Sequence, residues 1–337
     1  MQVSVIGAGS WGTAVSWMLG GKGYDIALWS RETEIADGIN SAHRNPVYLR
    51  EVVLEPSVVA TPDIELALRA ADAVVMVTPS IGVRETAQAM KPFLSPDTPV
   101  VILSKGVEGG TNLLMTEVLE DVLGNRSRIA GLSGPNHAEE VSRGIPSATV
   151  VAAYEERIGL LFQDIFMTRF FRVYTNPDVA GVELCGASKN VVAVAAGMCD
   201  GLGYGDNTKA TLMTRGLAEM SRLGRAVGAN PLTYMGLAGM GDLIATCTSP
   251  HSRNRGLGEL VAQGGTMEEF HEKTHMVAEG AVACVTVDEL GKREGLELPI
   301  TQQVRAVLYE GQPVAEAEEA LLGREAGDEL HGLGLVE

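Results

Sequence analysis

The pattern of apolar and polar residues changes near residue 180. Before that point, short runs of β-branched and other apolar residues alternate with helical segments, and the later runs are continuously apolar. Continuous apolar strands separated by helices are typical of a parallel sheet covered on both faces. We therefore expect an α/β domain over residues 1–180, with strands near residues 2–6, 25–29, 58–60, 73–77, 100–103, 129–132, 148–152 and 171–174.

After residue 180 the strand pattern disappears and helical patterns take its place. The sequence predicts an all-α domain over residues 181–337. Its expected helices lie near residues 182–198, 207–227, 232–237, 254–263, 279–293, 302–309 and 313–322.

The first helix of this second half carries one charge in an apolar setting. Between Leu184 and Cys199 the only charged side chain is Lys189, and apolar residues surround it on every helical phase. A buried ammonium is costly unless it is paired. One interpretation is a lysine that extends to the edge of the core or pairs with one carboxylate. The other is a lysine with a lowered pKa that donates and accepts a proton beside a substrate.

A glycine-rich turn follows the first expected strand. Residues 7–12 read GAGSWG and lead into an apolar helical pattern. In this context Gly7 permits a tight turn, Gly9 lets the backbone approach a pyrophosphate, and Gly12 allows the helix to pack closely on the strand. The turn predicts a Rossmann-type dinucleotide-binding domain. A second glycine cluster, at 236–241, follows no clear strand and is not interpreted as a nucleotide site.

The end of the second expected strand bears on the choice of cofactor. Arg31 and Glu32 follow this strand. An acidic residue here favours the free ribose hydroxyls of NAD, whereas an arginine accommodates the additional phosphate of NADP. Because Arg31 comes first, we favour NADP, with NADPH as its reduced form, without excluding NAD. A solvated loop charge is an equal alternative for Arg31.

Three further places offer polar groups to a ligand. Lys105 follows the strand at 100–103, and ligands of parallel sheets lie outside the carboxyl ends of the strands; a solvent-facing loop lysine is the alternative. Asp242 either caps a helix or holds the ammonium of Lys189. Residues 249–256 are rich in hydroxyl, guanidinium and amide donors at an expected helix start, which favours an anion site over a basic surface turn.

Composition narrows the class of protein. The 337 residues carry a net charge of −17, so nucleic acid and acidic lipid surfaces are repelled and an anionic substrate must be captured by locally placed cations. The four cysteines lie far apart with no pair at metal-ligand spacing, so we expect reduced packing residues and no metal site. No stretch is expected to be long and apolar enough to span a bilayer, which indicates a cytoplasmic protein without stable membrane insertion.

With these residues assembled, the chain closely resembles the bacterial NAD(P)-dependent glycerol-3-phosphate dehydrogenases over nearly its whole length. The resemblance rests on separate motifs at residues 7–14, 104–106, 133–135, 189–190, 206–210, 241–243, 252–255 and 277–280. It implies NAD(P)H-dependent, reversible reduction of dihydroxyacetone phosphate to sn-glycerol 3-phosphate, which supplies phospholipid synthesis. It also implies a homodimer.

The resemblance assigns roles to individual residues. Lys189 would be the proton acceptor and donor, Asp242 would orient it, and Lys105 would take part in catalysis. The substrate would contact Lys105, Gly134, Asn136, Lys189, Asp242, Ser252, Arg253 and Asn254. Together with the glycine turn, the cofactor contacts would be Gly7, Gly9, Ser10, Trp11, Gly12, Arg31, Lys105, Ala138, Arg253, Val277 and Glu279.

Two departures and two rival functions stand beside this interpretation. The family usually has Ser or Thr where this chain has Asn136, and some members have a second basic residue where this chain has Glu32. A hydroxyacid dehydrogenase of similar architecture would also use a lysine on the first helix after the sheet, although the donors at 252–254 favour a phosphorylated substrate. A non-catalytic dinucleotide sensor would have no need for a lysine in an apolar helix.

Overall fold

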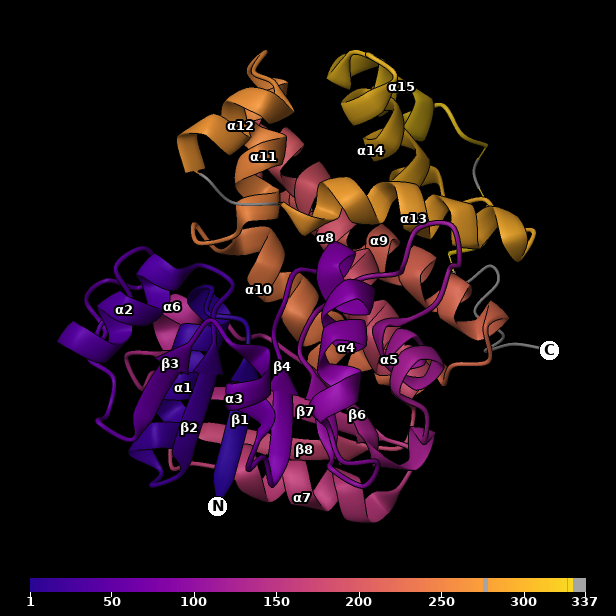
Figure 1. Cartoon of the computed structure of the whole chain (residues 1–337). Coiled ribbons are helices and arrows are strands. Elements are labelled where there is room, and N and C mark those ends of the chain that lie inside the picture. The colour runs from indigo at the N-terminus through magenta and orange to yellow at the C-terminus, as the bar shows by residue number, and fades with distance from the viewer. Residues whose placement is uncertain (275–277, 326, 330–337) are drawn as a thin grey trace. The chain divides into compact units, whose positions relative to one another are not determined.

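The computed structural model describes residues 1–274, 278–325 and 327–329, and it divides into two compact units (Figure 1). The sheet unit comprises Met1–Ser104 and Leu113–Val179, and the helical unit comprises Lys105–Asn112 and Ala180–Glu337. The predicted fold class, a Rossmann-type α/β domain followed by an all-α domain, is confirmed. The segment Lys105–Asn112, which the sequence placed in the first domain, groups with the helices, where Lys105 binds Asp242.

The sheet unit contains one eight-stranded sheet with the order β3-β2-β1-β4-β5-β6-β7-β8. All neighbouring strands run parallel except β6 and β7, which are antiparallel. The expectation of a parallel sheet is therefore corrected at this one pair. The strands are β1 (Gln2–Ile6), β2 (Asp25–Trp29), β3 (Val58–Thr61), β4 (Ala73–Met76), β5 (Val100–Ile102), β6 (Ile129–Ser133), β7 (Ser147–Ala153) and β8 (Phe171–Asn176).

The chain reverses after β6 because no full crossover helix follows it. The connection contains only α6 (Ala138–Val141), whereas a parallel neighbour requires the chain to return across the sheet, usually through a longer helix. Side chains instead join the end of β6 to the start of β7. Asn136 Nδ2 donates to the Ala148 carbonyl at 3.1 Å, and Thr149 Oγ1 donates to the Ser133 carbonyl at 2.9 Å.

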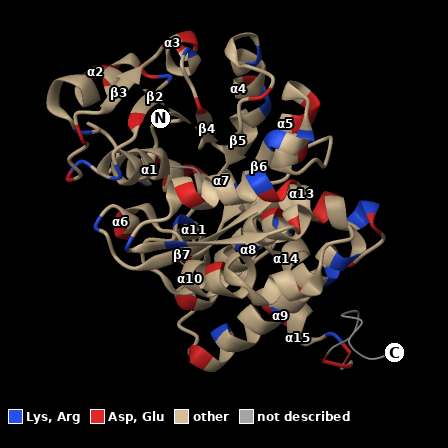
Figure 2. Cartoon of the chain, turned by 90° about the horizontal axis from the view of Figure 1, so that it is seen from below, with Lys and Arg blue, Asp and Glu red and all other residues tan. Residues whose placement is uncertain are grey.

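Helices cover both faces of this sheet, so its central strands β4 and β5 are apolar and buried throughout. Within β4, Val75 packs into the core on one face, while Val74 and Met76 pack into the core on the other. Charged side chains lie mainly on the helices and loops (Figure 2). The first face is covered by α1 (Ser10–Gly21), α2 (Thr33–Ala42) and α7 (Glu156–Phe166), and the second by α3 (Ile64–Leu68), α4 (Val83–Met90) and α5 (Met115–Leu123).

The helical unit is built around one buried helix, α8 (Val179–Gly201). Two glycines let α11 touch the backbone of α8. A Cβ at Gly197 would lie 1.9 Å from the Arg255 carbonyl oxygen, and a Cβ at Gly258 would lie 1.9 Å from the Val194 carbonyl oxygen. The other helices are α9 (Asp206–Ala226), α10 (Asp242–Thr248), α11 (Arg253–Ala262), α12 (Met267–Thr274), α13 (Glu279–Arg293), α14 (Pro299–Tyr309) and α15 (Val314–Leu322).

Two expectations for the helical half are corrected. The segment predicted near 232–237 is a 3₁₀ helix, η4 (Pro231–Met235), followed by a π-helical turn, η5 (Leu237–Gly241), that runs directly into α10. In addition, α8 is long and apolar enough to span a membrane by length and composition. Because 94% of its apolar window is buried inside the protein, this helix is accounted for as a core helix.

Candidate active site

The glycine turn of the sheet unit has the geometry of a phosphate-binding loop. Gly7 has φ +122°, a conformation that favours glycine, and its N–H donates to the Trp29 carbonyl at 3.0 Å. A Cβ at Gly12 would lie 1.8 Å from the Gly7 carbonyl oxygen, so α1 packs directly against the turn. A Cβ at Gly9, by contrast, would meet nothing within 4 Å.

The N-terminus of α1 is open toward a ligand. Gly9 is its N-cap residue, and no side chain caps the first turn. Uncapped N–H groups at the start of a helix bind phosphate, and the free space beside Gly9 admits one. Ser10 and Trp11 begin the helix, and the Trp11 ring packs 6.5 Å from that of Phe171. These residues fit a dinucleotide.

Arg31 and Glu32 pair with each other at the end of β2. The Arg31 guanidinium lies 3.3 Å from a Glu32 carboxylate oxygen, and the two side chains are 82% and 50% exposed. The structure therefore shows both the cation that suits NADP and the acid that suits NAD at the same strand end. Both side chains are exposed and can move, so their positions in the structure do not decide between NAD and NADP.

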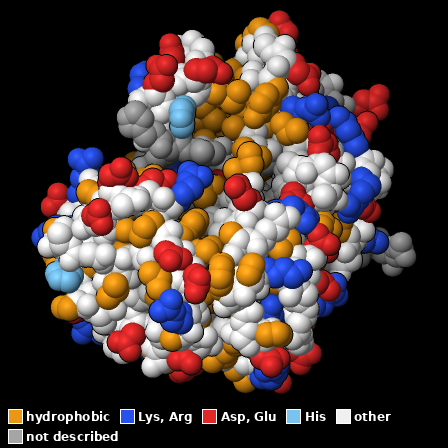
Figure 3. Space-filling view, in the orientation of Figure 1, with side chains coloured by type: hydrophobic (Ala, Val, Ile, Leu, Met, Phe, Trp, Pro, Cys, Tyr) orange, Lys and Arg blue, Asp and Glu red, His pale blue; other side chains and the backbone are white. Residues whose placement is uncertain are grey.

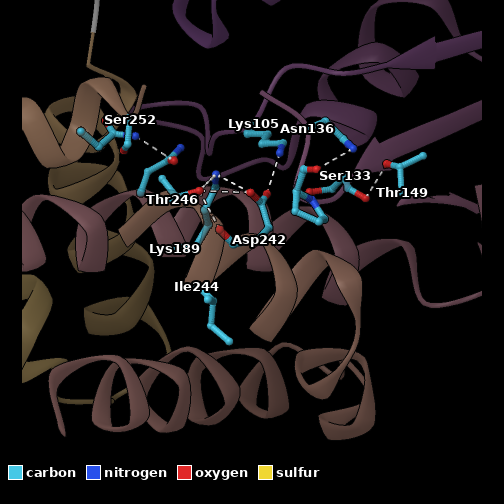
Figure 4. A network of polar contacts seen from close by, with 12 residues as sticks. Lys105, Ser133, Asn136, Thr149, Lys189, Asp242, Ile244, Thr246 and Ser252 are labelled. Carbon is cyan, nitrogen blue, oxygen red and sulfur yellow. Dashed lines mark hydrogen bonds and ion pairs between the residues drawn. The ribbon is translucent and has the colours of Figure 1, made fainter. Parts of the chain in front are cut away.

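The helical unit brings two predicted lysines, Lys189 and Lys105, together around the carboxylate of a third predicted residue, Asp242 (Figure 4). Lys189 Nζ on α8 donates to Asp242 Oδ1 at 2.8 Å, and Lys105 Nζ donates to Asp242 Oδ2 at 2.6 Å. The side chains of Lys189 and Asp242 are 7% and 3% exposed, while that of Lys105 is 23% exposed. Of the two sequence-based alternatives for Asp242, the structure shows the ion pair. The N-cap residue of α10 is Gly241, and no side chain caps it.

Sequence reasoning missed a fourth member of this group, Thr246. Lys189 Nζ donates to Thr246 Oγ1 at 2.6 Å, and the same hydroxyl lies 2.6 Å from the Asp242 carbonyl oxygen. The spacing of four residues places Thr246 above Asp242 on one face of α10. The four-residue spacing from Asp242 is the only sequence signal for Thr246, and it points to this role only if Asp242 is known to bind Lys189.

The pKa values of Lys189 and Asp242 are both lowered, but for different reasons. Burial lowers the pKa of Lys189 to about 8, with Asp242 opposing that effect and Lys105 adding to it. For Asp242, burial would raise the pKa, but the ammonium groups of Lys105 and Lys189 outweigh burial and hold it below its ordinary value. Lys189 is thus able to exchange a proton near neutral pH while Asp242 stays ionised.

The predicted anion site lies at the start of α11. Ser252 is the N-cap residue, and its hydroxyl accepts from the Arg255 N–H at 3.2 Å. The next side chain, Arg253, is exposed. Asn254 is buried: its Nδ2 donates to Asn190 Oδ1 at 2.9 Å, and its Oδ1 accepts from the Gly280 N–H at 2.8 Å. Asn254 therefore ties α11 to α8 and α13, a positioning role that the sequence did not indicate.

Other predicted contacts lie in separate places. Gly134, with φ +157°, packs against Thr149 in the sheet unit. Asn136 Oδ1 is buried without a hydrogen-bond partner among the described residues. Ala138 begins α6, and Glu279 begins α13 in the helical unit. Val277 lies outside the described residues.

Metal chemistry has no visible site in the described part of the chain. No group of three or more His, Cys, Asp or Glu side chains there could hold a metal ion. The four cysteines are unbridged, and burial raises the pKa of Cys247 and of Cys284 to about 12. Lys189, by contrast, has a pKa lowered to about 8.

Fold and site define the class of protein: an NAD(P)-dependent oxidoreductase with a dinucleotide-binding sheet unit and a helical unit that carries a buried lysine–aspartate pair. The family models for the N-terminus and the C-terminus of NAD-dependent glycerol-3-phosphate dehydrogenase match residues 2–158 and 178–319. The chain belongs to this family, as the sequence motifs predicted.

Individual relatives cover nearly the whole chain. It is 46% identical over 323 residues to the glycerol-3-phosphate dehydrogenase (NAD(P)+) of Moorella thermoacetica, with 96% of each chain covered. A corresponding enzyme of Salinibacter ruber is 46% identical over 330 residues, with 97% of each chain covered. The crystal structure of glycerol-3-phosphate dehydrogenase from Coxiella burnetii matches with a TM-score of 0.92 at 35% identity, covering 96% of this chain and 99% of that one.

Proposed function

We propose that this chain interconverts dihydroxyacetone phosphate and sn-glycerol 3-phosphate, with NAD or NADP as redox partner. The observation that carries the proposal is the buried Lys189–Asp242 pair in a chain of this family. A ketone reduction requires a proton at the oxygen as the hydride reaches carbon, and Lys189 is the buried group with a pKa near neutrality. In the reverse direction the neutral amine accepts the proton of the alcohol.

The surrounding residues keep Lys189 ready for this exchange. Asp242 and Thr246 accept its N–H groups and so fix the direction of its ammonium. Lys105 holds the second oxygen of Asp242, which keeps the carboxylate ionised and adds a cation for a developing negative charge on the substrate oxygen. Asp242 is thus a positioning residue and Lys105 a catalytic one.

The phosphate of the substrate is assigned to the start of α11. Arg253 and the N–H groups behind Ser252 offer charge-assisted donors in a chain whose net charge of −17 otherwise repels anions. Binding there converts phosphate affinity into orientation at the carbonyl. Gly134 and Asn136 complete the proposed substrate contacts.

The cofactor is assigned to the glycine turn and to Arg31, with Ser10, Trp11, Ala138, Lys105, Arg253, Val277 and Glu279 as further contacts. A bound nicotinamide dinucleotide supplies the hydride for carbon 2 of the ketone. Arg31 supports binding of NADPH, because a guanidinium can pair with the additional phosphate. Its ion pair with Glu32 keeps NADH as an alternative, because a carboxylate can accept from the free ribose hydroxyls. We further propose net reduction toward phospholipid precursors, a homodimer and a cytoplasmic location, on the strength of family membership.

The test is nicotinamide absorbance with purified protein and dihydroxyacetone phosphate, using NADPH and NADH in parallel. Lys189→Ala should lower turnover about 10²–10⁴-fold, the usual contribution of a positioned acid–base group. The matched control is Lys292→Ala, which removes another lysine paired with a buried aspartate, Asp288.

Near-normal turnover by Lys189→Ala would refute the assignment of the proton donor. If the native protein binds either cofactor but oxidises neither with dihydroxyacetone phosphate, the proposed substrate is wrong. Oxidation with a 2-oxo acid in its place would then support the hydroxyacid dehydrogenase alternative.

A further inference from the structure

The helical unit contains a large cavity that the proposed reaction does not use. It has a volume of about 1310 Å³, is partly open to solvent, and is lined by residues of α8, α9, α14 and α15 and of the segments 295–297, 324–325 and 327–329. None of its lining residues is assigned to substrate or cofactor. Sites for small molecules commonly enclose about 300–1,000 Å³, so this cavity has room for a long ligand.

Part of the cavity lining is aliphatic. Met198 on α8, Leu212 on α9, Val304 on α14 and Leu321 on α15 line it. Aliphatic side chains from four helices can contact a hydrocarbon body and remove it from water. In the same unit, hydrophobic side chains also gather at the surface near α14 and the start of α13 (Figure 3).

One cation inside the cavity lacks a partner. Arg222 on α9 is half-buried and makes no hydrogen bond or ion pair with any residue that the structure describes. Its acidic neighbour Glu219 is committed elsewhere: the carboxylate accepts from the Ile300 N–H at 2.9 Å and from the Thr301 N–H at 3.0 Å. The five N–H donors of the Arg222 guanidinium therefore bond to no acceptor among the described residues.

Two other arginines, Arg215 and Arg324, add positive charge to the same cavity. Burial lowers the pKa of Arg222; Glu219 opposes the effect, and Arg215 and Arg324 add to it. Both of these arginines also line the cavity. Arg324 is paired with Glu297 at 3.1 Å, so part of the acidic lining is already neutralised.

We propose that this cavity binds an amphipathic anion, with a carboxylate or phosphate head on Arg222 and an aliphatic body along the apolar wall. Arginine recognises such heads through two parallel N–H···O bonds, and no acceptor among the described residues bonds to the Arg222 guanidinium. The remaining acids of the lining, Glu318, Glu325, Asp328 and Glu329, disfavour a head group placed beside them and so favour Arg222. This site does not depend on the proposed function.

The test is isothermal titration of the full chain with dodecyl phosphate below its micelle concentration. We expect one molecule bound per chain and at least about tenfold weaker binding by Arg222→Gln, because the variant removes charge-assisted hydrogen bonds to the head group. Thr211→Trp, which places a ring on the cavity wall, should also abolish binding. The matched control is Arg293→Gln, an exposed arginine outside the cavity, which should bind as the native protein does.

Titrations with other ligands test which parts of the molecule the cavity recognises. Dodecanoate should bind at the same site. Inorganic phosphate lacks the aliphatic chain and dodecanol lacks the anionic head, so each should bind at least about tenfold more weakly. Binding to phosphatidic acid vesicles without binding of monomeric dodecyl phosphate would overturn the proposal in favour of a membrane surface.

The oligomeric state provides the remaining check. If sedimentation shows a dimer that Thr211→Trp converts into monomers, and the native protein does not bind dodecyl phosphate, a second copy of the chain occupies the cavity and the proposal is wrong. Equal affinity of the native protein and Arg222→Gln would also overturn it. Circular dichroism and thermal unfolding of each variant distinguish lost binding from lost structure.

Discussion

At the residue scale, the proposed chemistry depends on the ammonium of Lys189, whose pKa the fold lowers. A lysine in water holds its proton far above neutral pH, whereas Lys189 is buried and has a pKa of about 8. Complete removal of water would make the charged form too costly, and Asp242 offsets part of that cost. The pair therefore tunes a proton donor while keeping the buried charge compensated.

The first residue-scale prediction concerns pH. Reduction needs protonated Lys189, so its kcat/KM should be level below about pH 8 and fall above it; oxidation needs the neutral amine, so its kcat/KM should rise toward pH 8 and then level. Asp242→Asn removes the group that raises the pKa of Lys189, so both profiles should move to lower pH. Profiles measured with both substrates check this, and an unmoved profile in Asp242→Asn would contradict it.

The second residue-scale prediction concerns cofactor choice. Glu32→Gln removes the carboxylate that pairs with Arg31 and that would repel an additional phosphate. The ratio of kcat/KM for NADPH to that for NADH should rise about tenfold. The variant keeps the guanidinium that suits the NADPH phosphate and loses the carboxylate that suits the NADH ribose. Glu34→Gln, an exposed acid two residues further along, is the control. A ratio that stays constant in Glu32→Gln would show that the pair does not govern the choice.

At the element scale, α8 carries Lys189 through the middle of the helical unit and depends on close neighbours for its burial. Glycines on α8 and α11 allow their backbones to touch, and Asn254 joins these two helices to α13. Close packing holds α8 in one position, and hydrogen bonds fix the helices that meet it. The position of the ammonium is thus a property of several helices together.

The element-scale prediction follows from that contact. In Gly258→Ala the new methyl group would lie 1.9 Å from the Val194 carbonyl oxygen, so the helices must separate. The free energy of unfolding should fall by about 1–3 kcal/mol or more. Gly21→Ala, in a helix where the added Cβ meets nothing within 4 Å, should leave stability unchanged or raise it. Chemical denaturation of both variants makes the comparison, and equal stability would argue against the close contact.

At the scale of the whole molecule, the two units contribute different residues to the proposed function. The glycine turn belongs to the sheet unit, while Lys189, Asp242 and Lys105 all belong to the helical unit. The segment Lys105–Asn112 leaves the sheet unit and returns to it, which gives the helical unit a lysine from the first half of the chain. Under the proposed function, the glycine turn and Lys189 should therefore be separable by mutation.

The whole-molecule prediction uses that separation. Gly9→Val should weaken dinucleotide binding at least about tenfold without loss of stability, because φ at Gly9 is −70° and its side chain would enter only the space proposed for the pyrophosphate. Lys189→Ala should show the reverse, with dinucleotide affinity kept and turnover lost. Calorimetric titration with NADPH and thermal unfolding measure both. Unchanged dinucleotide affinity in Gly9→Val would remove the glycine turn from the proposed site.

The sequence by itself determined the features that depend on local pattern. Continuous apolar runs marked the buried strands, the glycine turn after β1 marked the dinucleotide loop, and an apolar helix around one charge marked Lys189. Each feature is set by residues within a few positions of one another, so its physical cause is visible in the order of residues. The family motifs followed from the same local information.

Only the tertiary structure decided which distant groups meet. Lys189 and Asp242 are 53 residues apart, and the two readings of Asp242, helix cap or ion-pair partner, have the same local sequence. Thr246 and Asn254 acquired their roles in the same way, and the antiparallel pairing of β6 with β7 depended on where a loop returns to the sheet. Contacts of this kind are set by the packing of whole helices and strands, which the order of residues along a short segment does not contain.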